Sequence, residues 1–479
     1  MDADNADKDR FRDGGATVAR ERNLQLEAVI RELGWSQDQA AAHYRRTAAE
    51  NPTNPPSTVT RVHINSWVRG SRPEGAVPSI LCETFTRALG RVITPADIGL
   101  AANGDDVTEP PGWDVDTVTA LVDLGGRDMD MGRRQALVSA AYSAAGLALP
   151  GDPWWNQRLE VAQTRQPRLE RTVTSRDVEG IREMTAFFSQ RDQRRGGRAG
   201  RTALVGYLRT EVAEYLRSRA VSEQVRRELF SAAGELVYLA GWTGFDANEH
   251  PLAQHYFQLA TQLAADAGDG PLAGHILRAM AHQAVDLHQP GRALQFADAS
   301  MESRRYSEAT SREKALLGVV HARSLAAAGR KRDAGIALNR AEDDLNNARD
   351  GVEEPSRVFF FGEASLAHET ACTLRDMGYL ERAEEQFHRS VRTRLAQPFA
   401  RTHVVTLGYL GSVQARRGHL DEAIATWTKA LDAMDGVQSG RAREAVVQMR
   451  RSLSPVRGRG GSAAAELDDR ARGVLRRVG

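Results

Sequence analysis

Hydrophobic residues near the N-terminus recur at the spacing of an α-helix that buries one face. The first stripe consists of Leu26, Val29, Ile30 and Leu33. This spacing predicts a helix between the N-cap candidate Asn23 and the stop signal Gly34. The capping box Ser36–Gln39 predicts a second helix, and Thr60 is the expected cap of a third helix that ends near Val68.

Composition divides the rest of the chain into segments. The charged start lacks an apolar period and predicts disorder, whereas the acidic stretch after residue 104 contains Gly and Pro and predicts a linker. The Arg-rich end predicts a solvated basic tail, with a flexible linker at 455–462 and a short helix at 463–478. The predicted segments are a disordered arm at 1–20, a helical domain at 21–104, a linker at 105–115, a helical intermediate region at 116–224, a repeat domain at 225–440 and a basic tail at 441–479.

A repeated pattern of small and large residues occupies the region 225–440. Its clearest copy is Gly329, Ala334, Leu338 and Ala341. Glycine can end one helix in a tight turn, and the small residues let the next helix pack closely. The large residue then fills the gap between units, so the pattern predicts stacked helical hairpins. The five copies start at Asn248, His288, Gly329, Gly378 and Gly418.

Two known classes share these features. The segment around the second and third helices resembles the phage-repressor-like (XRE-type) helix-turn-helix class, and the hairpins resemble the tetratricopeptide class. Their combination resembles actinobacterial transcriptional regulators that join such a domain to a C-terminal tetratricopeptide repeat array. The resemblance implies an all-α fold, with an N-terminal helix-turn-helix bundle followed by a tetratricopeptide-like α-solenoid. The helix-turn-helix resemblance rests on Ser36, Gln37, Ile64, Trp67, Gly70 and Pro73.

The chain also departs from both classes. The segment between the second and third helices carries three prolines and is longer than the usual tight turn. Repeat units of about 40 residues exceed the usual length of about 34. The relative placement of the two helices and the register of the repeats therefore stay open.

The resemblance implies a sequence-specific transcriptional regulator that binds double-stranded DNA and acts in development or secondary metabolism. In this class the second helix of the pair enters the major groove. There an Arg can pair with guanine, an Asn with adenine and a Val methyl with thymine, while neighbouring Gln and Arg side chains suit phosphates. The candidate DNA-binding residues are Gln37, Thr60, Arg61, Val62, His63, Asn65, Ser66, Arg69 and Arg72.

Polar residues in the first helices of the hairpins are candidates for a ligand site. Helical-repeat arrays bind partners on a concave face, so we expect these repeats to sense a peptide or protein ligand, to mediate dimerisation, or both. The same residues would also suit the convex face or the contacts between repeats. A homodimer is expected because the nearly neutral first domain offers few phosphate contacts. The ligand candidates are Arg278, His282, His321, Arg323, Glu369, Tyr409 and Gln414.

Composition and charge limit which partners and which cellular compartment we expect for the chain. A formal net charge of +1 gives no overall attraction to nucleic acid, and without a run of ~18 apolar residues we expect no membrane partner. Cys82 and Cys372 are the two cysteines, which fits a reducing compartment. The polar N-terminus has no secretory pattern. We therefore expect a cytoplasmic protein, associated with the nucleoid when it binds DNA.

Catalytic motifs are absent from the sequence. It contains no His-Glu-x-x-His, no Gly-Lys-Ser/Thr phosphate loop and no Gly-x-Ser-x-Gly, so we expect no enzyme activity, cofactor or metal. The Gly-rich stretch Arg194–Gly200 favours an inter-helix loop and leaves a phosphate cradle as the alternative. A second functional class also stays open, namely a tetratricopeptide adaptor whose N-terminal helical domain binds protein rather than DNA.

Overall fold

The computed structural model divides the chain into two compact units. One comprises residues 1–48 and 56–106, and the other comprises residues 49–55 and 107–479. The predicted disordered arm, the Pro-rich loop and most of the predicted linker lie outside the described residues. The structure describes residues 22–49, 59–89, 93, 95, 97–100, 112–139, 149–164, 166–348, 353–454 and 461–478.

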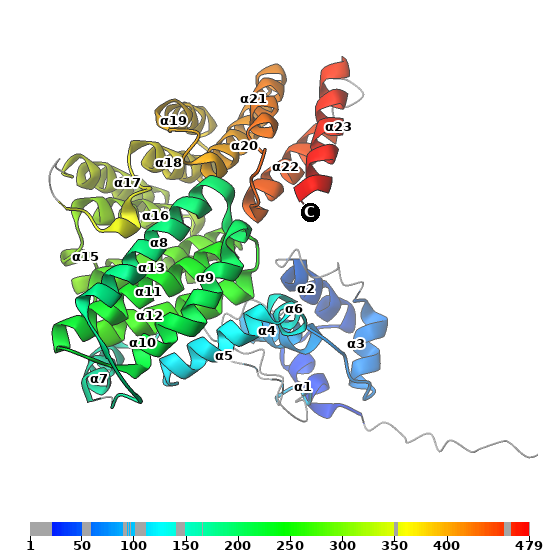
Figure 1. The fold of residues 1–479 in the computed structure, drawn as a ribbon. Coiled ribbons are helices and arrows are strands. Elements are labelled where there is room, and N and C mark those ends of the chain that lie inside the picture. The colour runs from blue at the N-terminus through cyan, green and yellow to red at the C-terminus, as the bar shows by residue number, and fades with distance from the viewer. Residues whose placement is uncertain are drawn as a thin grey trace, which may run out of the picture. The chain divides into compact units, whose positions relative to one another are not determined.

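Short helices make up most of the described part of the first unit (Figure 1). They are α1 (Leu24–Glu32), α2 (Gln37–Ala49), α3 (Arg61–Val68) and α4 (Val77–Leu89). The predicted stripe faces the core, with Leu26 fully buried and Leu33 partly buried. Asn23 caps α1 through its side-chain oxygen and also joins distant segments. Its backbone N–H donates to the Val68 carbonyl at 2.9 Å, and its amide donates to the Ile98 carbonyl at 2.8 Å.

The intermediate region 116–224 forms a layer in which α5, α6 and α7 pack against α12 (His250–Ala267). This packing helps to bury every residue of α12. Two short strands pair in parallel, which the sequence pattern did not predict because Val173 is the one buried residue of β1 and no alternation results. The elements are α5 (Thr117–Met129), α6 (Met131–Ser139), α7 (Asp152–Thr164), β1 (Leu169–Val173), α8 (Ser175–Arg195), η1 (Gly197–Ala199), α9 (Arg201–Tyr207), η2 (Leu208–Val212), α10 (Ala213–Arg217) and β2 (Ser218–Ala220).

Antiparallel helical hairpins follow and stack into an array (Figure 1). In each hairpin a first helix ends in a tight turn and a second helix packs back on it. The fold is therefore all-α, a helical bundle followed by a solenoid of helical repeats. The hairpins are α11 (Glu223–Asp246) with α12, α13 (Gly270–Asp286) with α14 (Pro290–Met301), α16 (Ser311–Ala327) with α17 (Lys331–Asn346), α18 (Glu363–Met377) with α19 (Leu380–Thr393), and α20 (Ala400–Arg416) with α21 (Leu420–Asp432). Two short helices, α15 (Arg304–Ser307) and η3 (Ser356–Val358), lie in the connections.

The repeat register follows from backbone geometry at the turn inside each hairpin. The five starting residues, Asn248, His288, Gly329, Gly378 and Gly418, all have positive φ. A left-handed residue ends an α-helix, and glycine adopts this conformation without strain. The alanine five positions later is fully buried in every copy, which lets the two helices approach closely. These alanines are Ala253, Ala293, Ala334, Ala383 and Ala423.

Replacing Gly411 with alanine is expected to destabilise the array by about 1–3 kcal/mol, because a new methyl group would overpack the core. Gly411 lies on α20, where an added Cβ would sit 2.6 Å from Cδ1 of the buried Trp427 ring. The control is Gly335→Ala on α17, where the added Cβ meets nothing within 4 Å. That change should stabilise the helix by roughly 0.5–1 kcal/mol. Urea unfolding followed by circular dichroism measures both, and equal effects would contradict the packing.

The predicted basic tail contains two packed helices, α22 (Gly440–Leu453) and α23 (Gly461–Val478), of which α23 matches the short helix expected at 463–478 and α22 was not expected. α22 packs against α20, and α23 packs against α21 and α22. Apolar residues spaced along both helices join one hydrophobic cluster, so the many arginines hid an amphipathic pattern. The flexible linker expected at 455–462 lies outside the described residues except for its last two positions, which begin α23. The buried members from these helices are Ala442, Val446, Met449, Leu453, Ala464, Leu467, Ala471 and Val474.

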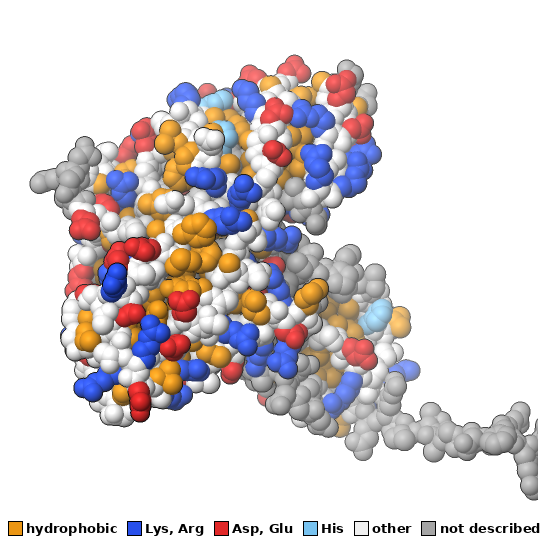
Figure 2. All heavy atoms as spheres, viewed as in Figure 1, with side chains coloured by type: hydrophobic (Ala, Val, Ile, Leu, Met, Phe, Trp, Pro, Cys, Tyr) orange, Lys and Arg blue, Asp and Glu red, His pale blue; other side chains and the backbone are white. Residues whose placement is uncertain are grey.

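The visible surface carries both signs of charge, in keeping with the small net charge. Figure 2 shows Lys and Arg side chains interspersed with Asp and Glu, and hydrophobic side chains gathered where α8 lies in Figure 1. Phe187 on α8 is one exposed aromatic residue, with 54% of its surface open. Among the described helices, none combines the length and hydropathy that a bilayer crossing needs.

Candidate DNA-reading surface and central cavity

The candidate recognition helix α3 is held by one face and exposed on the other. Ile64, Trp67 and Val68 are buried, and the Trp67 and Tyr44 rings lie 6.3 Å apart. Arg61, His63 and Ser66 are exposed on α3, as is Val62 with 73% of its surface open, while Asn65 is half-buried. The helix can therefore present side chains to a partner without losing its anchor in the core.

Two of the predicted DNA contacts cap α3. The backbone N–H of Thr60 donates to Nδ1 of His63 at 3.2 Å, and the Thr60 hydroxyl lies 3.1 Å from the same nitrogen. This capping box satisfies backbone groups at the helix start. The Nδ1 atom of His63 therefore holds the helix end, and the role of His63 as a DNA contact stays a prediction. Arg61, next to this cap, keeps the exposed position that the sequence predicted.

The candidate phosphate contacts lie at helix ends. Arg69 and Arg72 are exposed in the turn after α3, and Gln37 is half-buried at the first position of α2. The turn is fixed because the Gly70 N–H donates to the Trp67 carbonyl, and Gly70 has a φ of 97°. A further contact joins the hydroxyls of Ser66 and Ser71 at 2.6 Å. This contact gives Ser66, a predicted base contact, a structural role as well.

The first helices of five successive hairpins, α11, α13, α16, α18 and α20, all border one cavity in the second unit. The space open to the centres of water molecules is about 50 Å³, room for roughly four waters. Among the predicted ligand residues, Arg278, His282 and Glu369 line it. The other lining residues are Gln193, Trp242, Leu316, Val320, Phe360, Phe361, Ser365, His368, Arg394, Arg401, Thr402, Val405 and Arg441.

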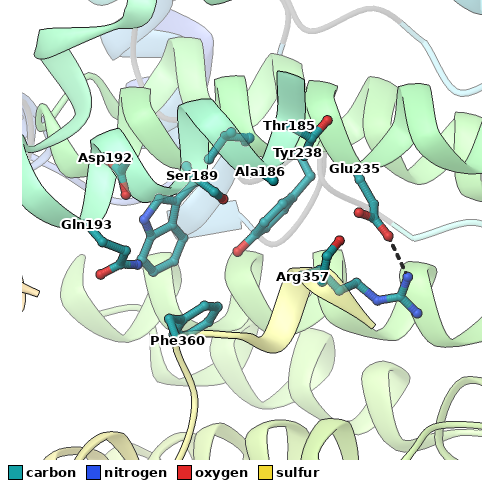
Figure 3. Close-up of a pocket in the computed structure, with 12 residues that line it drawn as sticks. Thr185, Ala186, Ser189, Asp192, Gln193, Glu235, Tyr238, Arg357 and Phe360 are labelled. Carbon is teal, nitrogen blue, oxygen red and sulfur yellow. Dashed lines mark hydrogen bonds and ion pairs between the residues drawn. The ribbon is translucent and has the colours of Figure 1, made fainter. Parts of the chain in front are cut away.

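Two segments outside the hairpin helices enclose this cavity. α8 packs against both α11 and α20, and the connection after α17 places Phe360 and Phe361 against the cavity. Figure 3 shows the adjoining pocket, where side chains of α8 and α11 point toward Arg357 and Phe360. Arg357 fixes that connection, since it donates to Glu235 and to Glu313 at 2.7 Å each.

Most of the charges around the cavity are paired. Arg401 bridges Asp192 and Asp246, with 3.2 Å between the nitrogen and oxygen atoms in both pairs. Arg323 pairs with Asp286 at 2.7 Å and with Glu369 at 3.2 Å. Arg441 lies 3.5 Å from Asp286, which therefore faces two guanidinium groups. Each acidic residue of this network is therefore paired with at least one arginine.

Burial controls the protonation of several groups in this network. Burial lowers the pKa of His282 to about 3, although Glu369 and Asp286 act in the opposite direction. Burial also lowers the pKa of His368 well below its usual value, and Arg394 lowers it further. Burial raises the pKa of Asp192 to about 7, although Arg401 opposes this shift. At neutral pH both histidines are therefore uncharged.

The remaining predicted ligand residues do not line the cavity. Arg323 does not line the cavity, but it donates hydrogen bonds to His282 and Glu369, which do. His321 contacts Asp298 at 2.8 Å, the Tyr409 ring stacks near His368, and Gln414 donates to Glu384 at 3.4 Å. Polar residues of the first helices were thus predicted on helices that border the cavity, but only Arg278, His282 and Glu369 line it, and their role in binding a ligand stays a prediction.

Several residues that line the cavity were not predicted from the sequence. A signal existed for His368, because it lies ten positions before its repeat start Gly378, as Arg278 does before His288. Arg394 and Arg441 had no such signal, since they lie just after α19 and at the start of α22. The Arg194–Gly200 loop is packed, since the Gly197 N–H donates to Asp246 at 2.9 Å, which leaves that donor unavailable to a phosphate.

One group of side chains has a spacing that a metal ion would accept. The ligand atoms of Glu384, His419 and Glu422 lie within 4.8 Å of one another. Arg417 already donates to Glu384 at 2.5 Å, and His419 and Glu422 are exposed. The Arg417 guanidinium already pairs with the buried Glu384 carboxylate, where a metal ion would otherwise bind. The cluster therefore behaves as an ion pair at the surface.

Comparisons with known proteins cover both units. The family model described as the SP15 N-terminal domain matches residues 26–101, less than half of the chain. That description names no helix-turn-helix class, so the resemblance stays a prediction. No curated protein matches the chain. One similar solved structure is a Rap protein complexed with competence and sporulation factor, at 10% identity and a TM-score of 0.36, covering 75% of this chain and 98% of that one. A TM-score this low carries no argument about a ligand.

Proposed function

We propose that the protein is a sequence-specific DNA-binding transcriptional regulator and that α3 reads the major groove. The supporting observation is the two-sided character of α3. Its inner face is buried through Ile64 and Trp67, while Arg61 and Val62 project outward near its N-terminal end. In a helix-turn-helix the first turns of the second helix meet base edges, where Arg pairs with guanine O6 and N7.

Arg61→Ala is expected to weaken specific binding by about 1–3 kcal/mol, roughly 5- to 150-fold, because a bidentate base contact is lost. A gel shift on the DNA upstream of the gene, at fixed moderate salt, measures this loss. Arg31→Ala is the matched control, since Arg31 has an exposed side chain on α1 and lies outside the candidate contacts. Equal affinity of the two variants would contradict the role of Arg61.

Phosphate contacts from Arg69, Arg72 and Gln37 complete the proposed interface. Because these are few, we propose that two copies bind together, with half-sites about 34–36 Å apart along the duplex. A footprint with a single half-site would contradict pairing. A chain that binds no DNA at any salt would favour the alternative of a repeat adaptor whose first unit binds protein.

The helical array is proposed to carry the regulation. Such arrays bind partners on a surface built from successive first helices, and here five of these helices meet at one cavity. A peptide or protein ligand on the surface of these helices outside the cavity, or contact between two copies, would change the spacing of two DNA-reading units. Light scattering of the full chain, with and without candidate peptides, measures both effects. An unchanged molar mass together with no peptide binding would contradict the proposed regulatory role of the helical array.

A further inference from the structure

Two arginines on the central cavity form no ion pair with a carboxylate in the described chain. Arg278 is 2% exposed, and its Nη2 donates to the Tyr238 hydroxyl and to the His275 ring at 3.0 Å each. Arg394 is 8% exposed, and its Nη2 contacts the Ala364 carbonyl at 3.0 Å. The Nε atom of each arginine is buried without a hydrogen-bond partner. Both residues are thus buried cations with donors to spare.

Neutral neighbours compensate these charges only in part. The Arg278 guanidinium lies 5.7 Å from the centre of the Trp242 ring, a favourable but weak contact. Burial and the nearby Arg401 lower the pKa of Arg394 to about 10, although Glu369 acts in the opposite direction. Buried charges in proteins are normally paired or bound to a counter-ion. Glu369, which lines the cavity, already pairs with Arg323, and Asp192 in the adjoining pocket already pairs with Arg401.

We propose that the central cavity binds a small organic anion. Its oxyanion group, a carboxylate or a phosphate, accepts hydrogen bonds from Arg278 and Arg394. Its apolar part contacts the aromatic lining formed by Trp242, Phe360 and Phe361. This chemistry matches the lining, which combines excess guanidinium charge with aromatic and aliphatic walls.

The size of the cavity favours a small molecule. α8 and the connection carrying Phe360 close the space to about 50 Å³ for water centres, too little for an extended chain segment. Because the lining comes from five hairpins, from α8 and from α22, an occupant would touch most of the second unit. The inference does not depend on DNA binding, since all of these residues lie outside residues 1–106.

Isothermal titration of the full chain tests the proposal with butyrate, ethyl phosphate, inorganic phosphate and neutral butyramide at constant ionic strength. Butyrate or ethyl phosphate should bind at least tenfold more tightly than butyramide, and the tighter of the two identifies the head group. Inorganic phosphate should bind more weakly than ethyl phosphate. Binding of butyramide equal to that of both organic anions, or no binding of either organic anion, would overturn the proposal.

Two variants separate binding from folding. Arg394→Met and Arg278→Met should each weaken binding of the organic anion at least tenfold. Arg394→Met should keep or raise the melting temperature of the free protein, since it removes a buried charge that has no acidic partner. The control Arg389→Met changes a half-exposed arginine on α19 and should leave binding unchanged. Undiminished binding in both cavity variants would overturn the assignment of Arg278 and Arg394.

Discussion

Arg401→Met is expected to destabilise the second unit by about 3–5 kcal/mol at about pH 8, because it leaves buried carboxylates without their shared cation. Arg401 lies between Asp192 and Asp246, and all three side chains are at most 3% exposed. Asp246 would keep the Ser439 hydroxyl as a donor. Asp192 would keep the side chains of Trp242 and Arg441, which also lower its pKa. Urea unfolding of the full chain, followed by circular dichroism, measures the loss.

The same variant should depend on pH in a defined direction. Burial raises the folded-state pKa of Asp192 to about 7, above its ordinary value of 3.8, so its contribution to stability falls as pH rises through that interval. Removing Arg401 takes away a cation that lowers this pKa. The folded-state pKa then rises further, and the deficit of Arg401→Met should be larger at about pH 8 than at about pH 5.5.

Two controls define the origin of this loss. Arg389→Met removes an exposed pair with Glu363 and should cost at most about 1 kcal/mol. Adding Asp192→Asn to Arg401→Met should recover part of the stability, because the uncompensated carboxylate becomes neutral. A loss below 1 kcal/mol for Arg401→Met, or a deficit independent of pH, would show that these pairs are not desolvated as described.

Trp427→Ala is expected to cost about 3–5 kcal/mol through loss of buried surface and a residual cavity. Trp427 is 1% exposed on α21, and its indole N–H donates to the Gly408 carbonyl at 3.2 Å. Its removal would leave α20 and α21 poorly packed against each other and against α22. Urea unfolding followed by circular dichroism gives the change in unfolding free energy.

The control for this variant is a large apolar residue on the surface of the same array. Ile336 on α17 is 60% exposed, so Ile336→Ala should change stability by no more than about 0.5 kcal/mol. An equally small change in stability for Trp427→Ala would mean that α20 and α21 pack together without the indole ring. That outcome would contradict the role of the large repeat position as a filler.

Local patterns predicted the helices and the existence of the repeats well, because each depends on a few neighbouring residues, whereas the register of the repeats stayed open. Ile64 and Trp67 were expected in the core and are buried. Size matching between helices also leaves a sequence trace, since Gly411 precedes Trp427 by the same interval as Gly241 precedes Phe257. The glycine on the first helix makes room for the ring on the second.

The cavity was predicted less well, because it depends on contacts between distant segments. Arg394 and Arg441 come from outside the first helices of the hairpins, and nothing in their own neighbourhoods marks them as lining residues. The packing of the tail was not predicted for a related reason. The apolar face of α23 becomes buried only because α21 lies beside it. Charge counts over a segment conceal such a face.

The placement of α8 across the array changes how the whole second unit should unfold. Repeat arrays usually behave as one-dimensional chains that fray from either end, since each repeat contacts only its neighbours. Here Gln193 receives a hydrogen bond from Thr402, and Asp246 receives one from Ser439, across 209 and 193 residues of sequence. These contacts couple the beginning of the unit to its end, so local fraying is suppressed and unfolding becomes a single cooperative event.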